Sequence, residues 1–409
     1  MILRLNITSF LLAMVLLLAC CDGKHSSSDF KPSGALPVLR IDTKSNRPVD
    51  SKDRWRSANM QIDGVSKEWD ILIKGRGNTT WEWSEKKPYR IKLEESSAML
   101  GLNESKHFVL LSEAAVPFAM ISTILGFELS RRVGMDYTPE VKPVELVLNN
   151  DYQGLYLLTE QIRVEPNRIN VKSWPRHNDW IDRGGWLLEI DGWNTYQRLT
   201  VNSRMGINIS VEYHFPKTLK AWQREYINQL LARVDSAICV SDTMSVEWEK
   251  FVDIDAVAKF YLVNELMDNC EAFSGSCWLS RDAADTAKIK FGPVWDFGSA
   301  FSHRYIDRPD CFIYENVPKY CSPLWLSELV KFPRFRRCVR DYYTKFRKAN
   351  GDQIDGFIDV FIEQVAEACI SERNRWPNSP VAQLRKQGEF AKSYFRRKIK
   401  FLDSQWLYK

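Results

Sequence analysis

The chain has few of the residues from which metal-stabilised or nucleic-acid-binding modules are built. It contains only five histidines in 409 residues, and none of its cysteines forms a Cys-x-x-Cys pair. A structural zinc site, which needs closely spaced cysteine and histidine ligands, is therefore not expected. The formal net charge of +5 is too small an excess over this length to indicate binding to nucleic acid. We detect no internal repeats and, beyond the N-terminus, no long apolar run.

The N-terminus has the pattern of a bacterial lipoprotein signal over residues 1–19. Arg4 precedes a short apolar run, and Ala19 stands directly before Cys20. The run is short for a membrane span, and a small residue before cysteine is typical of lipoprotein cleavage. We predict a lipid on Cys20 and a flexible tether over residues 20–35, with a simple secretory signal or a membrane anchor as the alternative. The body would then be lipid-anchored to the membrane of a bacterial cell envelope, periplasmic or at the cell surface.

Two compositional regions follow the tether. Residues 36–215 are rich in short alternating runs separated by turns, including an Asn149-Asn150 hairpin signal. One helix is predicted among them, over Pro117–Val133. Residues 216–409 are mainly helical, because apolar residues recur at helical spacing. The predicted helices are Ala221–Val240, Asp253–Met267, Leu324–Arg347, Ile354–Cys369 and Pro380–Trp406.

A glycine-punctuated turn followed by a basic strand has the features of an anion site. Gly75 and Gly77 bracket Arg76, and glycine allows positive φ and close approach of the backbone to a ligand. Side chains alternate between the two faces of the strand that follows, which places Arg90 and Lys92 on one face. Two cations on one face suit phosphate. A solvated basic edge that discourages aggregation is the alternative interpretation.

Two later turns carry acidic and polar residues. Asp296 stands between Trp295 and Phe297, and a carboxylate buried among aromatic rings needs a partner, a proton or a metal ion. Upstream, the stretch 264–278 follows a helical run and includes Asp268, Asn269, Glu271 and Ser276. The separation of these two clusters is typical of a catalytic loop followed by a metal-binding loop.

Six ordered motifs resemble the CotH kinase family: GRGNTTW, KKPYRIKL, NDYQGLYLLTEQI, GGWLLEID, NELMDNCEAF and FGPVWDFGSAF. The resemblance runs from about Leu36 to the C-terminus. It implies an α+β, bilobal, atypical protein kinase-like fold, with a β-rich N-terminal lobe at 36–215 and a mainly helical C-terminal lobe at 216–409. It also implies a site in which a lysine steadies phosphates, an acidic residue faces the acceptor hydroxyl and an aspartate holds the metal.

Carried over by motif, Asp296 matches the metal-binding aspartate of the family. Glu271 stands where members usually have an acidic catalytic aspartate, with Asn269 in the same stretch. Glutamate keeps the charge but extends the carboxylate by one methylene. Ser276 replaces an asparagine that serves some members as a further metal ligand, and Gly298 replaces a second aspartate. Both changes weaken the expected metal site.

The nucleotide would contact the first half of the chain. Glu160 matches an acidic family position and could pair with Lys87 or Lys92, as a kinase lysine pairs with its glutamate, and the sequence does not choose between them. Arg76 and Arg90 complete this predicted set. The alternative for Glu160 is a surface position on a strand.

Two other charged groups have structural explanations. Glu189 and Asp191 share a strand face and could bind substrate or solvate a sheet edge. The basic residues of 396–400 flank an apolar stripe on the last predicted helix, so we expect them to form its solvated face.

Two functions follow from these observations. The first is an envelope-anchored CotH-type kinase that uses ATP with Mg²⁺ or Mn²⁺ to phosphorylate hydroxyl groups of an exported or surface protein. The second is a catalytically inactive member that binds a protein or a glycan at the cell surface, an interpretation favoured by Glu271, Ser276 and Gly298.

Overall fold

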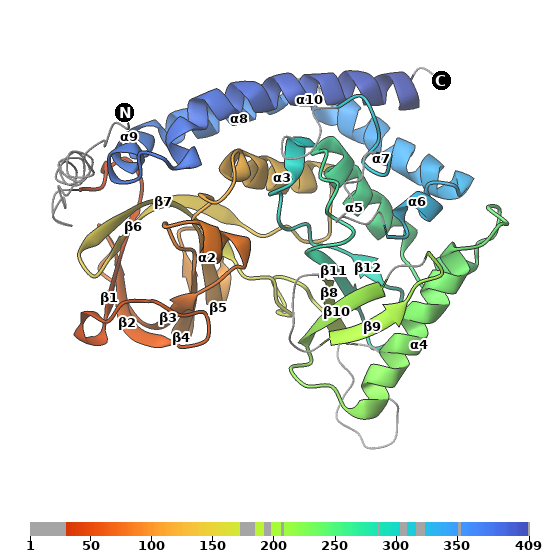
Figure 1. Cartoon of the computed structure of the whole chain (residues 1–409), viewed down its shortest axis with the longest axis horizontal. Helices are drawn as coiled ribbons and strands as arrows, with labels where there is room; N and C mark the ends of the chain where they lie inside the picture. The colour runs from red at the N-terminus through yellow and green to blue at the C-terminus, as the bar shows by residue number, and fades with distance from the viewer. Residues whose placement is uncertain are drawn as a thin grey trace, which may run out of the picture.

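The computed structural model describes residues 30–171, 185–191, 198–205, 208–284, 286–302, 309–315, 324–350 and 353–407. A β-barrel and a second sheet lie side by side, and helices run across the top of both in Figure 1. Cys20 and most of the predicted tether lie outside the described residues. Within the described part of the chain, every helix is too short or too polar to cross a membrane.

The barrel contains seven strands in the order β1-β2-β3-β4-β5-β7-β6. Neighbouring strands are antiparallel, except that β1 pairs in parallel with β6 and so closes the sheet. Closure leaves no free edge in the barrel. Its strands are β1 (Val38–Thr43), β2 (Arg56–Ile62), β3 (Glu68–Gly75), β4 (Tyr89–Met99), β5 (Leu102–Leu111), β6 (Val141–Leu148) and β7 (Asp151–Glu160), with the short helix α2 (Thr79–Trp83) between β3 and β4.

Alternation along β4 fills the barrel interior as predicted. Tyr89, Ile91 and Leu93 are buried, whereas Arg90 and Lys92 are partly exposed on the other face. The predicted hairpin is also confirmed, because Asn149 and Asn150 connect β6 to β7 with φ of 52° and 60°. Asparagine tolerates this left-handed conformation, which matches the twist of the flanking strands.

The second sheet has five strands in the order β12-β11-β8-β10-β9. One face, which includes Leu188 and Val211, belongs to the main apolar core shared with the helices. The opposite face carries the alternate residues of β8, β10 and β11, among them Glu189 and Trp278. The strands are β8 (Trp186–Ile190), β9 (Arg198–Asn202), β10 (Asn208–Phe215), β11 (Cys277–Arg281) and β12 (Lys290–Phe291).

The predicted helices are confirmed, with two of them divided in two. The stretch 324–347 contains α6 (Leu326–Leu329) and α7 (Pro333–Asn350), because Pro333 starts a new helix. The stretch 354–369 likewise covers nearly all of α8 (Gln353–Gln364) and the first turn of α9 (Ala366–Arg375). The remaining helices are α3 (Ala119–Val133), α4 (Ala221–Ile238), α5 (Ile254–Leu266) and α10 (Leu384–Trp406), and 3-10 helices cover Lys44–Asn46, Glu247–Lys250, Ala300–Ser302 and Pro380–Gln383.

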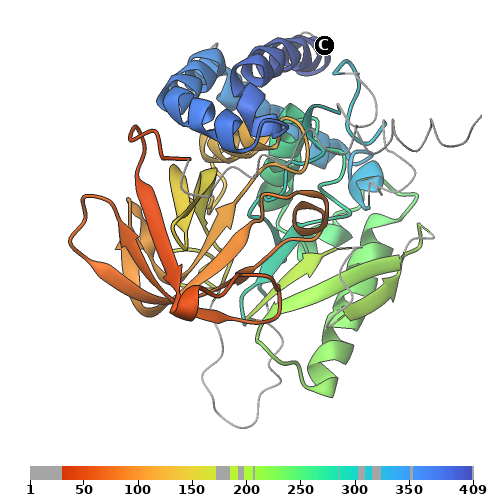
Figure 2. The same ribbon diagram turned by 60° about the vertical axis from the view of Figure 1, so that its left-hand side comes forward.

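The helices connect the two β structures. Turning the molecule by 60° brings the barrel forward and shows α8, α9 and α10 stacked above it (Figure 2). α9 packs against β7 of the barrel, while α3 and α5 pack together between the barrel and the second sheet. The site described below lies where these parts meet.

The expectation of a bilobal, atypical protein kinase-like fold with a β-rich N-terminal lobe and a mainly helical C-terminal lobe is wrong. The chain is mixed α+β, but its first sheet closes into a barrel and a separate second sheet follows. Alternating apolar residues specify which face of each strand is buried. They do not specify that Val38–Ile41 pairs with Glu145–Leu148, and this pairing is what closes the barrel.

The predicted solvated face of the last helix is wrong at one position. Lys398 is fully buried, with its Nζ 2.5 Å from a Glu265 carboxylate oxygen and 3.0 Å from Oδ1 of Asp268. Tyr394 donates its hydroxyl hydrogen to the other Asp268 oxygen. Lys400 is exposed as expected. Lys398 is buried because it pairs with two carboxylates at and just after the C-terminal end of α5.

Candidate functional site

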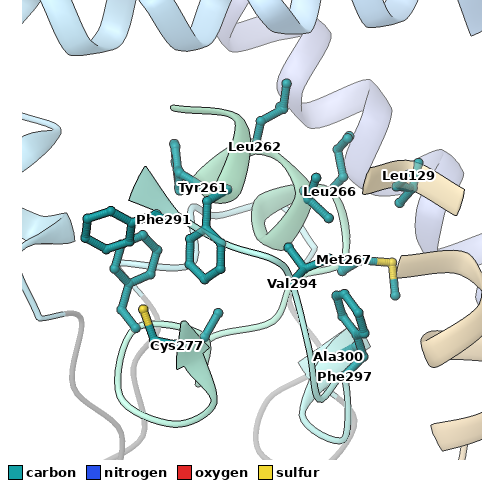
Figure 3. Packing of buried hydrophobic residues seen from close by; sticks show 14 of the residues in the cluster. Leu129, Tyr261, Leu262, Leu266, Met267, Cys277, Phe291, Val294, Phe297 and Ala300 are labelled. Atoms are coloured by element: carbon teal, nitrogen blue, oxygen red, sulfur yellow. The ribbon is translucent and has the colours of Figure 1, made fainter. Parts of the chain in front are cut away.

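The loop that carries Asp296 is anchored from behind by the apolar core. The Phe297 ring packs edge-on against Phe127 of α3 at a centroid distance of 6.2 Å. Ser122 of the same helix donates its hydroxyl hydrogen to the Phe297 carbonyl oxygen at 2.9 Å. Figure 3 shows side chains of this loop beside side chains from the end of α5 and the residue after it: Val294, Phe297, Leu266 and Met267. The loop is therefore fixed before any ligand binds.

Asp296 points away from this core. Its backbone has the left-handed φ of 58°, and its side chain is exposed. Oδ1 accepts a hydrogen bond from the backbone N–H of Gly298 at 3.0 Å. The expectation of a carboxylate buried among aromatic rings is wrong, because Phe297 turns into the core while the residue before it in sequence faces solvent. An exposed, backbone-held carboxylate is available to a ligand.

Asn269 and Glu271 hold the Asp296 loop from the α5 side. Asn269 is fully buried, and its Nδ2 donates to the Asp296 carbonyl oxygen at 3.1 Å and to Oδ1 of Asn264 at 3.0 Å. The Glu271 carboxylate accepts a short hydrogen bond from the Ser299 hydroxyl. Asn269 therefore shapes the loop, whereas Glu271 is partly exposed beside it.

Ser276 lies close to Glu271 along a tight turn. The backbone N–H of Gly275 donates to the Glu271 carbonyl oxygen at 3.0 Å, and Ser276 has φ of 50° before β11 begins. The left-handed conformation turns the chain sharply here. The turn keeps Ser276 on the same loop as the candidate catalytic carboxylate.

Arg76 meets this loop from the barrel. It follows the last residue of β3, and its guanidinium lies over the Trp295 ring at 5.9 Å. Burial lowers the pKa of Arg76, while the nearby carboxylates of Asp296, Glu113 and Glu189 raise it. Arg76, the cation predicted at the glycine-punctuated turn, therefore interacts with carboxylates from three other segments of the chain.

Glu113 belongs to this site and was missed by the sequence analysis. It lies two residues after the last residue of β5, Leu111, and has φ of 47°. Burial is the main cause that raises its pKa to about 7 and Asp296 adds to the rise, although the hydrogen bond from the Thr123 hydroxyl, 2.8 Å long, opposes it. A carboxyl group whose pKa is raised to near neutrality beside other charged groups is a functional-site candidate. A single glutamate after an apolar strand belongs to no motif, so the sequence did not mark Glu113 as a site residue.

Arg90 extends the positive charge along the barrel. Its pKa falls to about 10, first because of burial and then because Arg163 and Arg76 are nearby. The guanidinium lies 5.7 Å from the centre of the Trp55 ring, and its Nε is buried without a hydrogen-bond partner among the described residues. Mutually repelling cations with a spare donor favour an anionic ligand.

The other predicted nucleotide-binding residues have partners within the barrel. Lys87 donates to the Trp81 carbonyl oxygen at 2.6 Å, and Lys92 stands opposite His107 in the β4–β5 pair. Glu160 is fully buried and accepts hydrogen bonds from Asn103 N–H, Glu140 N–H and the Tyr137 hydroxyl, at 2.7, 3.3 and 2.8 Å. In the described part of the chain, Glu160 forms no ion pair with either lysine.

A different lysine forms the buried ion pair. Lys86 is 2 % exposed, and its Nζ lies 2.8 Å from Oε2 of Glu372 on α9. Positive charge at Lys86 also lowers the pKa of Glu113. The sequence analysis singled out the neighbouring Lys87 instead, because nothing local shows that a lysine finds its partner on a distant helix.

The structure therefore divides the predicted residues into two groups. The first group lies at the Asp296 loop or is connected to it through Arg76, which interacts electrostatically with both Asp296 and Arg90: Arg76, Arg90, Asn269, Glu271, Ser276 and Asp296. The second group contacts other parts of the first half of the chain: the Lys87 and Glu160 side chains form hydrogen bonds there, and Lys92 stands opposite His107 in the barrel. Exposed carboxylate oxygens next to guanidinium groups can hold a divalent cation together with a phosphate-bearing ligand.

Comparison with protein families gives one match. A family model described as CotH kinase protein matches residues 73–402. The matched range includes every predicted site residue except Cys20. A comparison with curated proteins found no match.

Proposed function

This chain belongs to the CotH kinase protein family, and on that premise we propose that it uses ATP with Mg²⁺ or Mn²⁺ to phosphorylate hydroxyl groups of another protein. The observation that carries the proposal is that the Arg76 guanidinium lies over the ring of Trp295, the residue before Asp296, and interacts electrostatically with the carboxylates of Asp296 and Glu113. Phosphoryl transfer depends mainly on positioning and on neutralising charge. A cation beside an exposed carboxylate supports both requirements.

The donor set fits a metal-bound nucleotide. Arg90 has a buried Nε that lacks a protein partner among the described residues, and Arg76 is its cationic neighbour. Asp296 would hold the metal ion, with Ser276 as a further oxygen ligand. Bound ATP and metal would supply the phosphoryl group and neutralise its charge.

We assign the proton-accepting role to Glu271. The Ser299 hydroxyl orients its carboxylate beside the Asp296 loop, and Asn269 fixes that loop through the Asp296 carbonyl oxygen. A carboxylate held in this way can accept the proton of an acceptor hydroxyl. Glutamate would take the role that aspartate has in most family members, with a side chain that is one methylene longer.

We propose that the reaction takes place at a bacterial cell envelope. The lipoprotein pattern ending at Cys20 supports a lipid anchor, and an anchored enzyme would meet exported or surface proteins as substrates.

The test is transfer of the labelled terminal phosphate of ATP by the purified protein, with Mg²⁺ and Mn²⁺ in separate reactions. Asp296→Asn should abolish transfer and metal-dependent ATP binding together. Glu271→Gln should lower transfer by about 100-fold or more while ATP binding remains, because general-base catalysis contributes about that much. Glu94→Gln, at an exposed position of β4, is the matched control and should leave both unchanged.

Transfer that persists in Asp296→Asn would contradict the metal assignment. No transfer and no metal-dependent ATP binding in the parent protein would contradict the kinase proposal. The chain would then be an inactive member that binds a protein or a glycan at the cell surface.

A further inference from the structure

The outer face of the second sheet carries a group of ligand atoms that phosphoryl transfer does not require. We propose that Glu189, Glu212 and His214 bind a divalent transition-metal ion, such as Zn²⁺ or Mn²⁺. One oxygen or nitrogen atom from each side chain lies within 4.8 Å of the other two. The site is distinct from Asp296, because its residues come from β8 and β10.

Strand pairing brings the three residues together. Glu212 of β10 stands directly opposite Glu189 of β8, and His214 is two residues further along the same strand. The register shifts at a β-bulge between Tyr213 and Phe215, so the His214 side chain is placed by its contact instead: its Nε2 lies 2.8 Å from Oε2 of Glu189, on the Glu189 face of the sheet. All three therefore project from the face opposite the one that packs on the apolar core, where Val211 and Tyr213 lie.

Coordination would replace the hydrogen bond between His214 and Glu189 and would shift the three ligand atoms by small distances. His214 Nε2 already lies 2.8 Å from Oε2 of Glu189. Bonds of about 2.0–2.2 Å to zinc place neighbouring ligand atoms on the order of 3.4 Å apart in a tetrahedral site. Imidazole and carboxylate ligands together suit Zn²⁺ and Mn²⁺ better than Mg²⁺, which prefers oxygen atoms and keeps several waters.

Charge and packing also favour a cation here. Glu189 is 8 % exposed and faces a second carboxylate across the strand pair. Like charges directly opposite each other destabilise a sheet, and a divalent ion would turn that repulsion into attraction. The Trp278 ring lies 4.4 Å from the His214 ring and covers one side of the group.

The group borders the candidate kinase site. Trp278 and Trp295 belong to one apolar cluster, and the Arg76 guanidinium lies over Trp295. Negative charge at Glu189 raises the pKa of Arg76. A metal bound here would hold Glu189 and the neighbouring Trp278 in place near Arg76. Its binding does not depend on whether the chain transfers phosphate.

The test is binding of Zn²⁺ and, separately, Mn²⁺ to the metal-free full-length protein by titration calorimetry. The parent should bind one ion at this site, and His214→Gln and Glu212→Gln should each weaken that binding by at least tenfold. Glutamine at 214 keeps a hydrogen-bond donor for Glu189, so the sheet should still fold, which circular dichroism would verify. Coordination through imidazole should also shift the His214 ring signals in NMR spectra.

Two controls separate this site from others. Asp296→Asn should leave the affinity unchanged, because that carboxylate belongs to a different loop. Glu247→Gln, at an exposed position paired with Lys250, should have no effect either. Equal affinity in the parent and in folded His214→Gln, or no binding by the parent, would overturn the proposal, and neither result would bear on ATP binding at Asp296.

Discussion

Lys86 and Glu372 are 286 residues apart in sequence, yet their charged groups meet at 2.8 Å inside the protein. Neither side chain is more than 2 % exposed. Glu372 also accepts hydrogen bonds from the Leu155 N–H and the Ser379 hydroxyl. The pair joins the segment just before β4 to α9 and so connects the barrel to the helices.

We expect Glu372→Gln to destabilise the protein by about 3–5 kcal/mol, because removing one charge leaves the other buried without compensation. Urea unfolding would measure the change. The control is Glu363→Gln, which breaks the exposed pair with Arg385 and should cost no more than about 1 kcal/mol. Similar small losses in both variants would contradict a structural role for the buried pair.

A second buried lysine gives a parallel prediction. Lys398→Met should lower the free energy of unfolding by about 3–5 kcal/mol, because Glu265 and Asp268 would lose the cation between them. Lys400→Met on the exposed side of the same helix should change it by less than about 0.5 kcal/mol. Thermal unfolding followed by circular dichroism distinguishes the two, and an equal response would show that Lys398 is not buried as described.

Glu113 should make stability depend on pH. Its pKa rises from the ordinary value of 4.5 to about 7, so between these values the folded protein holds a proton that the unfolded chain has released. The contribution of Glu113 to stability is therefore full below about pH 4.5 and is lost as the pH rises to about 7. The loss should be about 1–3 kcal/mol.

Glu113→Gln should remove this slope, because an amide does not titrate. The measurement is the difference in unfolding free energy between parent and variant at several pH values from 5 to 8. Glu94→Gln, an exposed carboxyl on β4, provides the comparison and should leave the slope as it is. Parallel curves for the parent and Glu113→Gln would show that this carboxyl has an ordinary pKa.

Gly126 should be sensitive to the addition of one methyl group. A Cβ at this position of α3 would stand 2.3 Å from the Phe297 ring, which supports the neighbouring Asp296. Gly126→Ala should therefore cost about 1–3 kcal/mol through overpacking, and it should also weaken metal-dependent ATP binding by moving the loop.

Gly356→Ala is the matched control for that substitution. It also lies within a helix, but a Cβ there meets nothing within 4 Å. Alanine is the better helix former, so this variant should gain about 0.5–1 kcal/mol. A gain in both variants would mean that Phe297 can move aside freely. Chemical denaturation would measure the stability of both variants, and nucleotide titration would measure their metal-dependent ATP binding.

Local patterns in the sequence determined most of the secondary structure. Alternation predicted the inward face of β4, and the Asn149-Asn150 pair predicted the hairpin between β6 and β7. Asp253 caps α5 by accepting a hydrogen bond from the Ala256 N–H. These features depend on neighbours within a few residues, which is the range over which sequence patterns carry information.

Tertiary structure decided how charged groups were distributed. Glu160 became buried under hydrogen bonds, whereas Asp296, expected to be buried, faces solvent. Lys398 is buried because it pairs with two buried carboxylates, Glu265 in α5 and Asp268 just after that helix. The same residue types occur on solvated faces of ordinary helices and strands, so composition does not distinguish the two situations.

The sequence by itself determined the family, the alternation of the strands, the spacing of the helices and the loops that carry Glu271 and Asp296. Only the tertiary structure decided that β1 pairs with β6 to close a barrel, that Glu113 joins Arg76, and that Glu189 faces Glu212. The reason is physical. Local preferences act between residues near in sequence, whereas strand pairing and charge burial depend on partners that are close only after the chain has folded.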